Sequence, residues 1–177
     1  MTAASARHVP VLGRMARDLD ERGALRPSTA TIMWIAYLAH AGLTMRALRS
    51  PDLRLPLPTC TARLAGAASV GAGAALCVDA MRQFSGPSEL TGTHSQPLVT
   101  SGIYRYSRHP QYLGYLAALT GAAVIRRSAT ALVWSATLAV AYAAWVPVEE
   151  QHLTRLFGQP YLDYVDRTHR WWGRSTA

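Results

Sequence analysis

Four uncharged apolar blocks constrain the fold of this chain more than any other feature. They cover residues 29–45, 64–78, 112–125 and 128–148. A helix that crosses the hydrocarbon core of a bilayer needs about 20 mostly apolar residues, within a range of about 17–25. The first and fourth blocks reach that range, the second reaches it if Asp79 and Arg82 pair at the membrane edge, and the third by length alone also fits a buried or re-entrant helix. The pattern predicts an all-α integral membrane protein with about four transmembrane helices.

The third and fourth blocks also carry small residues at a spacing of four. They are Gly114, Ala118 and Ala122 in one block and Ser135, Ala139 and Ala143 in the other. Small residues let helix backbones approach closely in a membrane. Only Arg126 and Arg127 clearly separate the blocks, so the last two helices are predicted to form a tight hairpin. After residue 150 the sequence predicts short cytoplasmic helices, one ending at Gly158 and one opening at Pro160.

The charge of the chain indicates a membrane protein rather than a nucleic-acid-binding protein. All eighteen basic residues are arginine and the net charge is +8, but the arginines are spread between the apolar blocks and form no continuous basic face. Anionic lipid headgroups are the expected partners. If both termini face the cytoplasm, twelve arginines lie inside and six outside, in agreement with the positive-inside tendency. We expect that orientation, in the plasma membrane of a prokaryote.

The length of 177 residues suits one domain. Residues 1–27 are arginine-rich, with Leu12, Met15 and Leu19 at helical spacing, which fits either a helix on the membrane surface or a floppy tail. Residues 28–177 are predicted to form the membrane domain. The two cysteines are too few for a disulfide framework or a metal site, so no metal is expected.

Two polar strings flank the predicted hairpin. Residues 102–114 read GIYRYSRHPQYLG, and residues 149–158 read EEQHLTRLFG. The hairpin would bring the first string, at Arg108 and His109, beside the two glutamates of the second. Pro110 can open the third helix, which leaves the preceding residues at its positive end, where anions are favoured. Taken singly, the first string also fits an interfacial anchor and the second a solvated helix end.

Together with residues 98–101, these strings resemble the C-terminal half of the isoprenylcysteine carboxyl methyltransferase and phospholipid methyltransferase family, integral-membrane enzymes that use S-adenosyl-L-methionine. The resemblance covers about residues 96–164, which would be the cofactor-binding half. It implies transfer of a methyl group to an oxygen, nitrogen or sulfur atom of a lipophilic or small acceptor at the cytoplasmic membrane face. The cofactor contacts that it implies are Gln96, Pro97, Leu98, Val99, Tyr104, His109, Pro110, Gln111, Tyr112 and Glu149.

The chemistry of S-adenosyl-L-methionine suits these residue types. Arg108 can offer a fork of donors to its carboxylate, and the tyrosines can offer a cation–π surface to its sulfonium. Glu149 or Glu150 can accept from the ribose hydroxyls. In-line attack on the methyl group needs mainly positioning, and we expect Glu150 or His109 to take a proton from the acceptor. Arg108, His109 and Glu150 are the predicted catalytic residues.

The acceptor side is predicted to involve Tyr142 and Trp145. In the prenylcysteine enzymes that the chain resembles, an arginine that helps to hold the substrate carboxylate stands where this chain has Trp145. This departure argues against a prenylcysteine carboxylate as the acceptor. The two aromatic residues instead favour an apolar acceptor that enters from the bilayer.

Two other functions fit parts of the sequence. Membrane sterol and steroid reductases have a similar C-terminal region with a tyrosine-rich tail and use NADPH. The chain is short for such an enzyme, and the paired glutamates followed by Phe157 and Gly158 fit the methyltransferases better. A non-catalytic membrane partner would be expected to lack a charged cofactor residue, whereas Arg108, His109 and Glu149 are all present.

Overall fold

The computed structural model describes residues 10–23, 25–49, 53–83 and 98–173. The elements in chain order are α2 (Pro10–Arg22), α3 (Pro27–Arg49), α4 (Thr59–Met81), the 3-10 helix η1 (Gly102–Arg105), α6 (Pro110–Ile125), α7 (Ala129–Phe157) and α8 (Gln159–Arg167). Over the described residues there is no strand, although an isolated bridge joins Arg54 to Ser128. The predicted all-α fold class is therefore confirmed.

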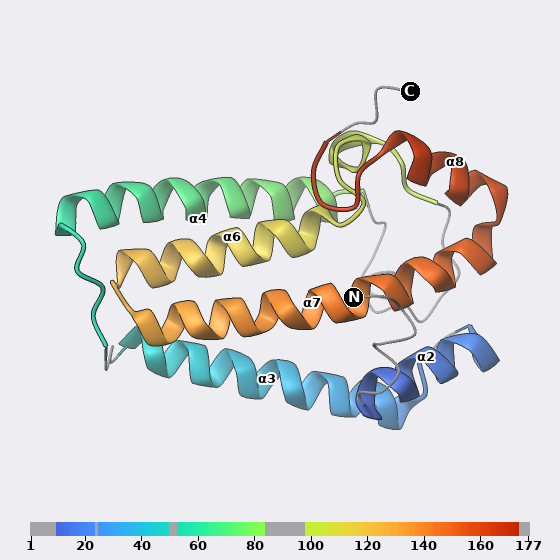
Figure 1. The fold of residues 1–177 in the computed structure, drawn as a ribbon, viewed down its shortest axis with the longest axis horizontal. Coiled ribbons are helices and arrows are strands. Elements are labelled where there is room, and N and C mark those ends of the chain that lie inside the picture. Colours follow the sequence, from blue (N-terminus) through green and yellow to red (C-terminus); the bar gives the residue numbers. More distant parts are fainter. Residues whose placement is uncertain (1–9, 24, 50–52, 84–97, 174–177) are drawn as a thin grey trace.

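Four long helices lie side by side in the order α4, α6, α7, α3 (Figure 1). At one end of this bundle, which we call the α8 end, α8 and η1 gather above α7, and α2 packs against α3 and α7. At the opposite end, which we call the turn end, the segment before α4 meets the turn between α6 and α7. The two polar strings of the sequence both lie at the α8 end.

Glycines bring α4 and α6 into close contact. A Cβ on Gly66 would lie 2.6 Å from the carbonyl oxygen of Gly121, and a Cβ on Gly114 would lie 2.7 Å from that of Gly73. Both glycine pairs repeat after seven residues, which is about two helical turns, so the antiparallel helices present matching faces. The sequence predicted that the small residues of α6 pack on α7. That prediction was wrong, because Gly114, Ala118 and Gly121 of α6 pack on α4. The reason is that glycine allows a closer backbone approach than the serine and alanines of α7.

The connection between α6 and α7 is short, and the two helices run antiparallel (Figure 1). Arg127 occupies the left-handed region with φ 53°. Ser128 caps α7 by accepting from the backbone N–H of Ala131 at 3.1 Å, and its hydroxyl donates to the carbonyl oxygen of Ala47 at 3.0 Å. A polar contact of 2.7 Å joins Thr120 to Ser135. The chain therefore turns back directly, and Ser135 of the expected α7 stripe contacts Thr120 of α6.

Two helices, α4 and α7, are long and apolar enough to cross a membrane by length and composition. With 16 residues, α6 extends about 24 Å, less than the ~30 Å hydrocarbon core of a typical bilayer. Large apolar side chains on α3, α4 and α7 are exposed, among them Ile35, Leu38, Leu64, Val133 and Val140. Such a surface agrees with lipid contact. Four membrane crossings and the orientation of the termini stay predictions.

The flanking segments differ in part from their predicted forms. Residues 10–22 form helix α2 rather than a floppy tail. The buried Ala16 of this helix packs with Val148 and Trp145 of α7. The helix therefore lies against the bundle. The separate helix expected after residue 150 is instead the last part of α7, which runs unbroken to Phe157. Gly158, with φ 61°, ends it, and α8 follows as the other predicted C-terminal helix.

Candidate functional site

Hydrogen bonds between side-chain hydroxyls and backbone groups hold the segment before α6 in place. The backbone N–H of His109 donates to the Ser107 hydroxyl at 3.1 Å, and both side chains are buried. The Tyr164 hydroxyl of α8 donates to the carbonyl oxygen of Tyr104 at 2.7 Å. As predicted, α6 begins with Pro110, whose ring suits the first helical position and leaves His109 as the residue before the helix.

Side chains from two segments distant in the sequence converge on Glu150. Its Oε1 lies 3.0 Å from Arg108 Nη2 and 3.3 Å from His109 Nε2. Its Oε2 accepts from Arg170 Nε at 3.0 Å and from Arg170 Nη2 at 2.5 Å. A carboxylate whose two oxygens both meet cationic donors is held ionised and is a poor proton acceptor. Glu150 therefore serves as the anchor of this group, which we call the Glu150 cluster (Arg108, His109, Glu150 and Arg170).

The tautomer of His109 follows from this contact. A carboxylate can only accept, so Nε2 carries the hydrogen in the bond to Glu150. In the neutral ring Nδ1 is then the acceptor, and it lies 3.8 Å from Glu149 Oε2. His109 is 2% exposed, which excludes bulk water from its ring. In this tautomer the acceptor nitrogen of the ring lies on the side of Glu149.

Aromatic rings continue from the cluster into the bundle. The Tyr112 ring stacks on His109 with centroids 5.5 Å apart and on Tyr142 with centroids 4.3 Å apart. The Tyr112 hydroxyl donates to Glu149 Oε2 at 3.0 Å and accepts from Trp145 Nε1 at 3.2 Å. Stacked electron-rich rings beside a carboxylate can stabilise a cationic group. The residues predicted for cofactor and acceptor thus share one connected surface.

Arg108 has donor capacity that nothing in the described chain uses. Its side chain is 8% exposed, and Nε and Nη1 are buried without a hydrogen-bond partner. A buried charged group with unpaired donors is costly unless another acceptor binds there. The carboxylate of S-adenosyl-L-methionine is such an acceptor, so the residues present fit the cofactor that the sequence predicts.

The C-terminal segment after α8 was missed by the sequence reasoning. The backbone N–H of Arg108 donates to the carbonyl oxygen of His169, and that of Gly173 donates to the carbonyl oxygen of Tyr106. These bonds place Arg170 on Glu150 and the ring of Trp171 6.1 Å from His109. Hydrogen bonding to Glu150 raises the pKa of Arg170, which keeps it charged. The adjacent Trp171 and Trp172 in an otherwise polar tail were the sequence feature that could have indicated a packed segment here.

The remaining predicted residues lie around the same end of the bundle. The Tyr104 hydroxyl donates to Gln111 Oε1 at 2.7 Å. Leu98 and Val99 pack against a buried group that contains Tyr104, and Pro110 is itself buried. Gln96 and Pro97 lie outside the described residues. Within those residues no three His, Cys, Asp or Glu side chains are grouped so as to hold a metal ion.

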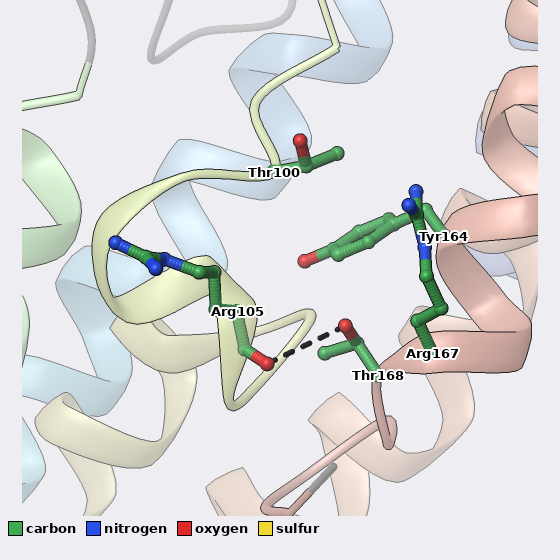
Figure 2. A pocket seen from close by; sticks show the side chains of 5 residues that line it. All are labelled: Thr100, Arg105, Tyr164, Arg167 and Thr168. Carbon is green, nitrogen blue, oxygen red and sulfur yellow. Dashed lines mark hydrogen bonds between the residues drawn. The ribbon is translucent and has the colours of Figure 1, made fainter. Parts of the chain in front are cut away.

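A separate cavity of about 160 Å³ lies between η1 and α8. It is lined by Thr100, Arg105, Tyr164, Arg167 and Thr168. In Figure 2 the Tyr164 ring projects between the two threonines, and the Thr168 hydroxyl donates to the carbonyl oxygen of Arg105. None of the Glu150 cluster lines this cavity, so the two features are distinct.

Comparison with known proteins gives a consistent result. The phospholipid methyltransferase family model matches residues 61–160. Protein-S-isoprenylcysteine O-methyltransferase B of Arabidopsis thaliana is 30% identical over 91 residues, which cover 51% of this chain and 46% of that protein. Protein-S-isoprenylcysteine O-methyltransferase of Mus musculus is 36% identical over 81 residues, 45% of this chain and 28% of that protein. The chain thus spans less than half the length of these curated relatives.

The family match contains most of the site. It includes all of α6 and α7 and three members of the Glu150 cluster, whereas Arg170 lies beyond it. It covers more than half of the chain. The family recognised from the two polar strings is confirmed, and this chain belongs to the phospholipid methyltransferase family.

Proposed function

We propose that the chain is a membrane methyltransferase that moves a methyl group from S-adenosyl-L-methionine to a lipophilic or small acceptor. The observation that carries this proposal is the buried Glu150 cluster, whose Arg108 retains unpaired donors beside the stacked rings of His109, Tyr112 and Tyr142. Membership of the family supports the reaction type. The names of the relatives, which are S-isoprenylcysteine O-methyltransferases, support methyl transfer to a lipidated or lipophilic molecule.

When bound, S-adenosyl-L-methionine supplies a methyl group on a cationic sulfonium. In this chain Arg108 would donate to its carboxylate, and the stack of aromatic rings beside Glu149 would lie near its cationic end. Glu149, with 26% of its side chain exposed, would accept from the ribose hydroxyls. The other residues proposed to line the cofactor are Gln96, Pro97, Leu98, Val99, Tyr104, Pro110 and Gln111.

Of the two predicted proton acceptors, the geometry favours His109. Glu150 already binds Arg108 and Arg170 through both oxygens. The Nδ1 atom of His109 would take the proton from the oxygen, nitrogen or sulfur atom of the acceptor. The deprotonated acceptor atom would then be the nucleophile that receives the methyl group. Glu150 would hold the imidazole in place and stabilise its charged form. Arg108 would balance part of the negative charge of the Glu150 carboxylate.

The acceptor is proposed to be lipophilic and to contact Tyr142 and Trp145. Trp145 packs with Leu12, Ala16 and Val148, so its surroundings are largely apolar. A cavity of about 260 Å³ between α6 and α7, lined largely by leucines and alanines with Thr120 and Ser135, offers room for part of an apolar chain. This composition supports an acceptor that approaches from the bilayer.

The proposed arrangement in the cell follows from the same residues. We propose that α3, α4, α6 and α7 all cross the bilayer, with residues 1–27 as a flanking segment of the membrane domain 28–177. The α8 end and both termini would face the cytoplasm, where the cofactor is made, in the plasma membrane of a prokaryote. The distribution of arginines supports this orientation.

Incubation of the purified full chain with methyl-labelled S-adenosyl-L-methionine and a total lipid extract tests the proposal. We expect label in a lipid fraction and micromolar binding of S-adenosylhomocysteine. The variant His109→Ala should lower turnover about 100-fold while cofactor binding changes much less, because a general base contributes about 10²–10⁴-fold. Binding of NADPH without S-adenosylhomocysteine would instead favour the reductase alternative, and binding of neither would favour the non-catalytic one.

A further inference from the structure

At the α8 end, a further buried donor without a partner belongs to Tyr161. This residue lies in the first turn of α8 and is 2% exposed, and its hydroxyl makes no hydrogen bond within the described chain. Most buried hydroxyls of tyrosine do find a partner. The Tyr164 hydroxyl, three residues later on the same helix, is satisfied by the carbonyl oxygens of Tyr104 and Ser107. The unpaired state is therefore specific to Tyr161.

The Tyr161 ring packs on Tyr164, and the Tyr164 hydroxyl donates to the carbonyl oxygen of Ser107, the residue before Arg108. Helix α8 therefore places Tyr161 close to the Glu150 cluster. Burial raises the pKa of Tyr161, and the charge of Glu150 raises it further while that of Arg108 opposes the rise. The hydroxyl therefore keeps its hydrogen at neutral pH and acts as a donor. Tyr161 also packs in the buried group that contains Tyr104 and adjoins Leu98 and Val99. The same part of the α8 end thus holds unpaired donors from Tyr161 and from Arg108.

Unpaired donors need an acceptor, and an anionic acceptor suits a guanidinium best. Arg108 uses Nη2 for Glu150, which leaves Nε and Nη1. A carboxylate is acceptor-only and can take several hydrogen bonds at once. Beside this position the C-terminal segment places Arg170 on Glu150 and Trp171 near His109, so a small anion held there would lie among buried groups.

We propose that Tyr161 is a cofactor-binding residue whose hydroxyl, together with Nε and Nη1 of Arg108, donates to the carboxylate of S-adenosyl-L-methionine. The inference rests on the proposed function and assigns a contact that the two polar strings do not contain. Tyr161 lies one residue beyond the family match, on a helix that only the fold brings to Arg108. The proposal predicts that the Tyr161 hydroxyl contacts the carboxylate and no other part of the cofactor.

Two ligands separate this contact from general effects on the site. The first is S-adenosylhomocysteine, and the second is the analogue 5′-deoxy-5′-(3-aminopropylthio)adenosine, which lacks the carboxylate. Calorimetry on the full chain in detergent gives both affinities. Tyr161→Phe should weaken S-adenosylhomocysteine about tenfold, as expected for a hydrogen bond to a charged group, and should change the analogue less than twofold.

Tyr164→Phe is the matched control on the same helix. It removes a hydroxyl bonded to the backbone, so it should lower the melting temperature and should not discriminate between the two ligands. Tyr161→Phe removes a hydroxyl with no partner, so the ligand-free variant should melt no lower than the wild type. Equal weakening of both ligands by Tyr161→Phe, or no weakening, overturns the inference while leaving the proposed function intact. A wild-type chain that binds neither ligand overturns both.

Discussion

The two ends of the helix bundle are both rich in arginine but use it differently. At the turn end, Arg126 and Arg127 make exposed hydrogen bonds, one to a backbone carbonyl and one to a threonine hydroxyl. Neither has an acidic partner among the described residues. At the α8 end, Arg108 is almost fully buried, and it shares the carboxylate of Glu150 with Arg170.

This difference separates a structural role from a functional one. Exposed arginines keep most of their hydration, so their contacts stabilise loops only modestly. A buried guanidinium loses its hydration and is tolerated only with a carboxylate beside it. Two donors of Arg108 have no partner among the described residues, and we propose that a ligand completes them. At the turn end, by contrast, the described residues include no buried charged group with an unpaired donor.

The largest effect is expected for Glu150→Gln, which removes the charge that compensates Arg108. Loss of one partner from a buried ion pair typically costs about 3–5 kcal/mol of stability. Methyl transfer should fall about 100-fold or more, because His109 and Arg108 both lose their anchor. Chemical denaturation in detergent and the labelled-methyl assay measure the two effects. Near wild-type values in both assays would show that the contrast between the ends is false.

A smaller effect is expected for Arg170→Gln. The carboxylate keeps Arg108 and His109, and water can replace part of the lost contact because the Arg170 side chain is 40% exposed. We expect a loss of about tenfold in kcat/KM, since hydrogen bonds to charged groups contribute about 1.5–3 kcal/mol. Arg167→Gln is the matched control. That arginine donates to a backbone carbonyl of its own helix and should leave kcat/KM within twofold. Equal losses in the two variants would remove Arg170 from the site.

The smallest effects belong to the turn end. Ser128→Ala removes the cap of α7 and the bond to α3, which should lower the free energy of unfolding by about 1–2 kcal/mol without changing turnover per folded molecule. Arg126→Gln, an exposed neighbour, should change stability by less than about 0.5 kcal/mol. Thermal melting and the methyl-transfer assay together measure both variants. A clear loss of turnover in either one would mean that the turn end reaches the chemistry.

Much of the candidate site could be predicted because covalent connection limits where its parts can go. Pro110 opens α6 and Ser128 caps α7, so two consecutive antiparallel helices return the chain to its starting end. His109 and Glu150 are then expected at the same end of the bundle, and the structure brings them into contact. The partner of α6 could not be predicted in the same way. The choice between α4 and α7 depends on the register of Gly66 and Gly73 against α6, which no local pattern sets.

Local chemistry along the chain therefore accounts for the long helices, the start of α6 at Pro110 and the meeting of an imidazole with a glutamate. Packing in three dimensions accounts for Arg170, Trp171 and Tyr161, which lie outside the two polar strings. Their positions depend on backbone hydrogen bonds between segments about 60 residues apart, such as Gly173 to Tyr106. Hydrogen bonds of this kind form between whatever segments the fold brings together, and they leave no periodic trace in the order of the amino acids.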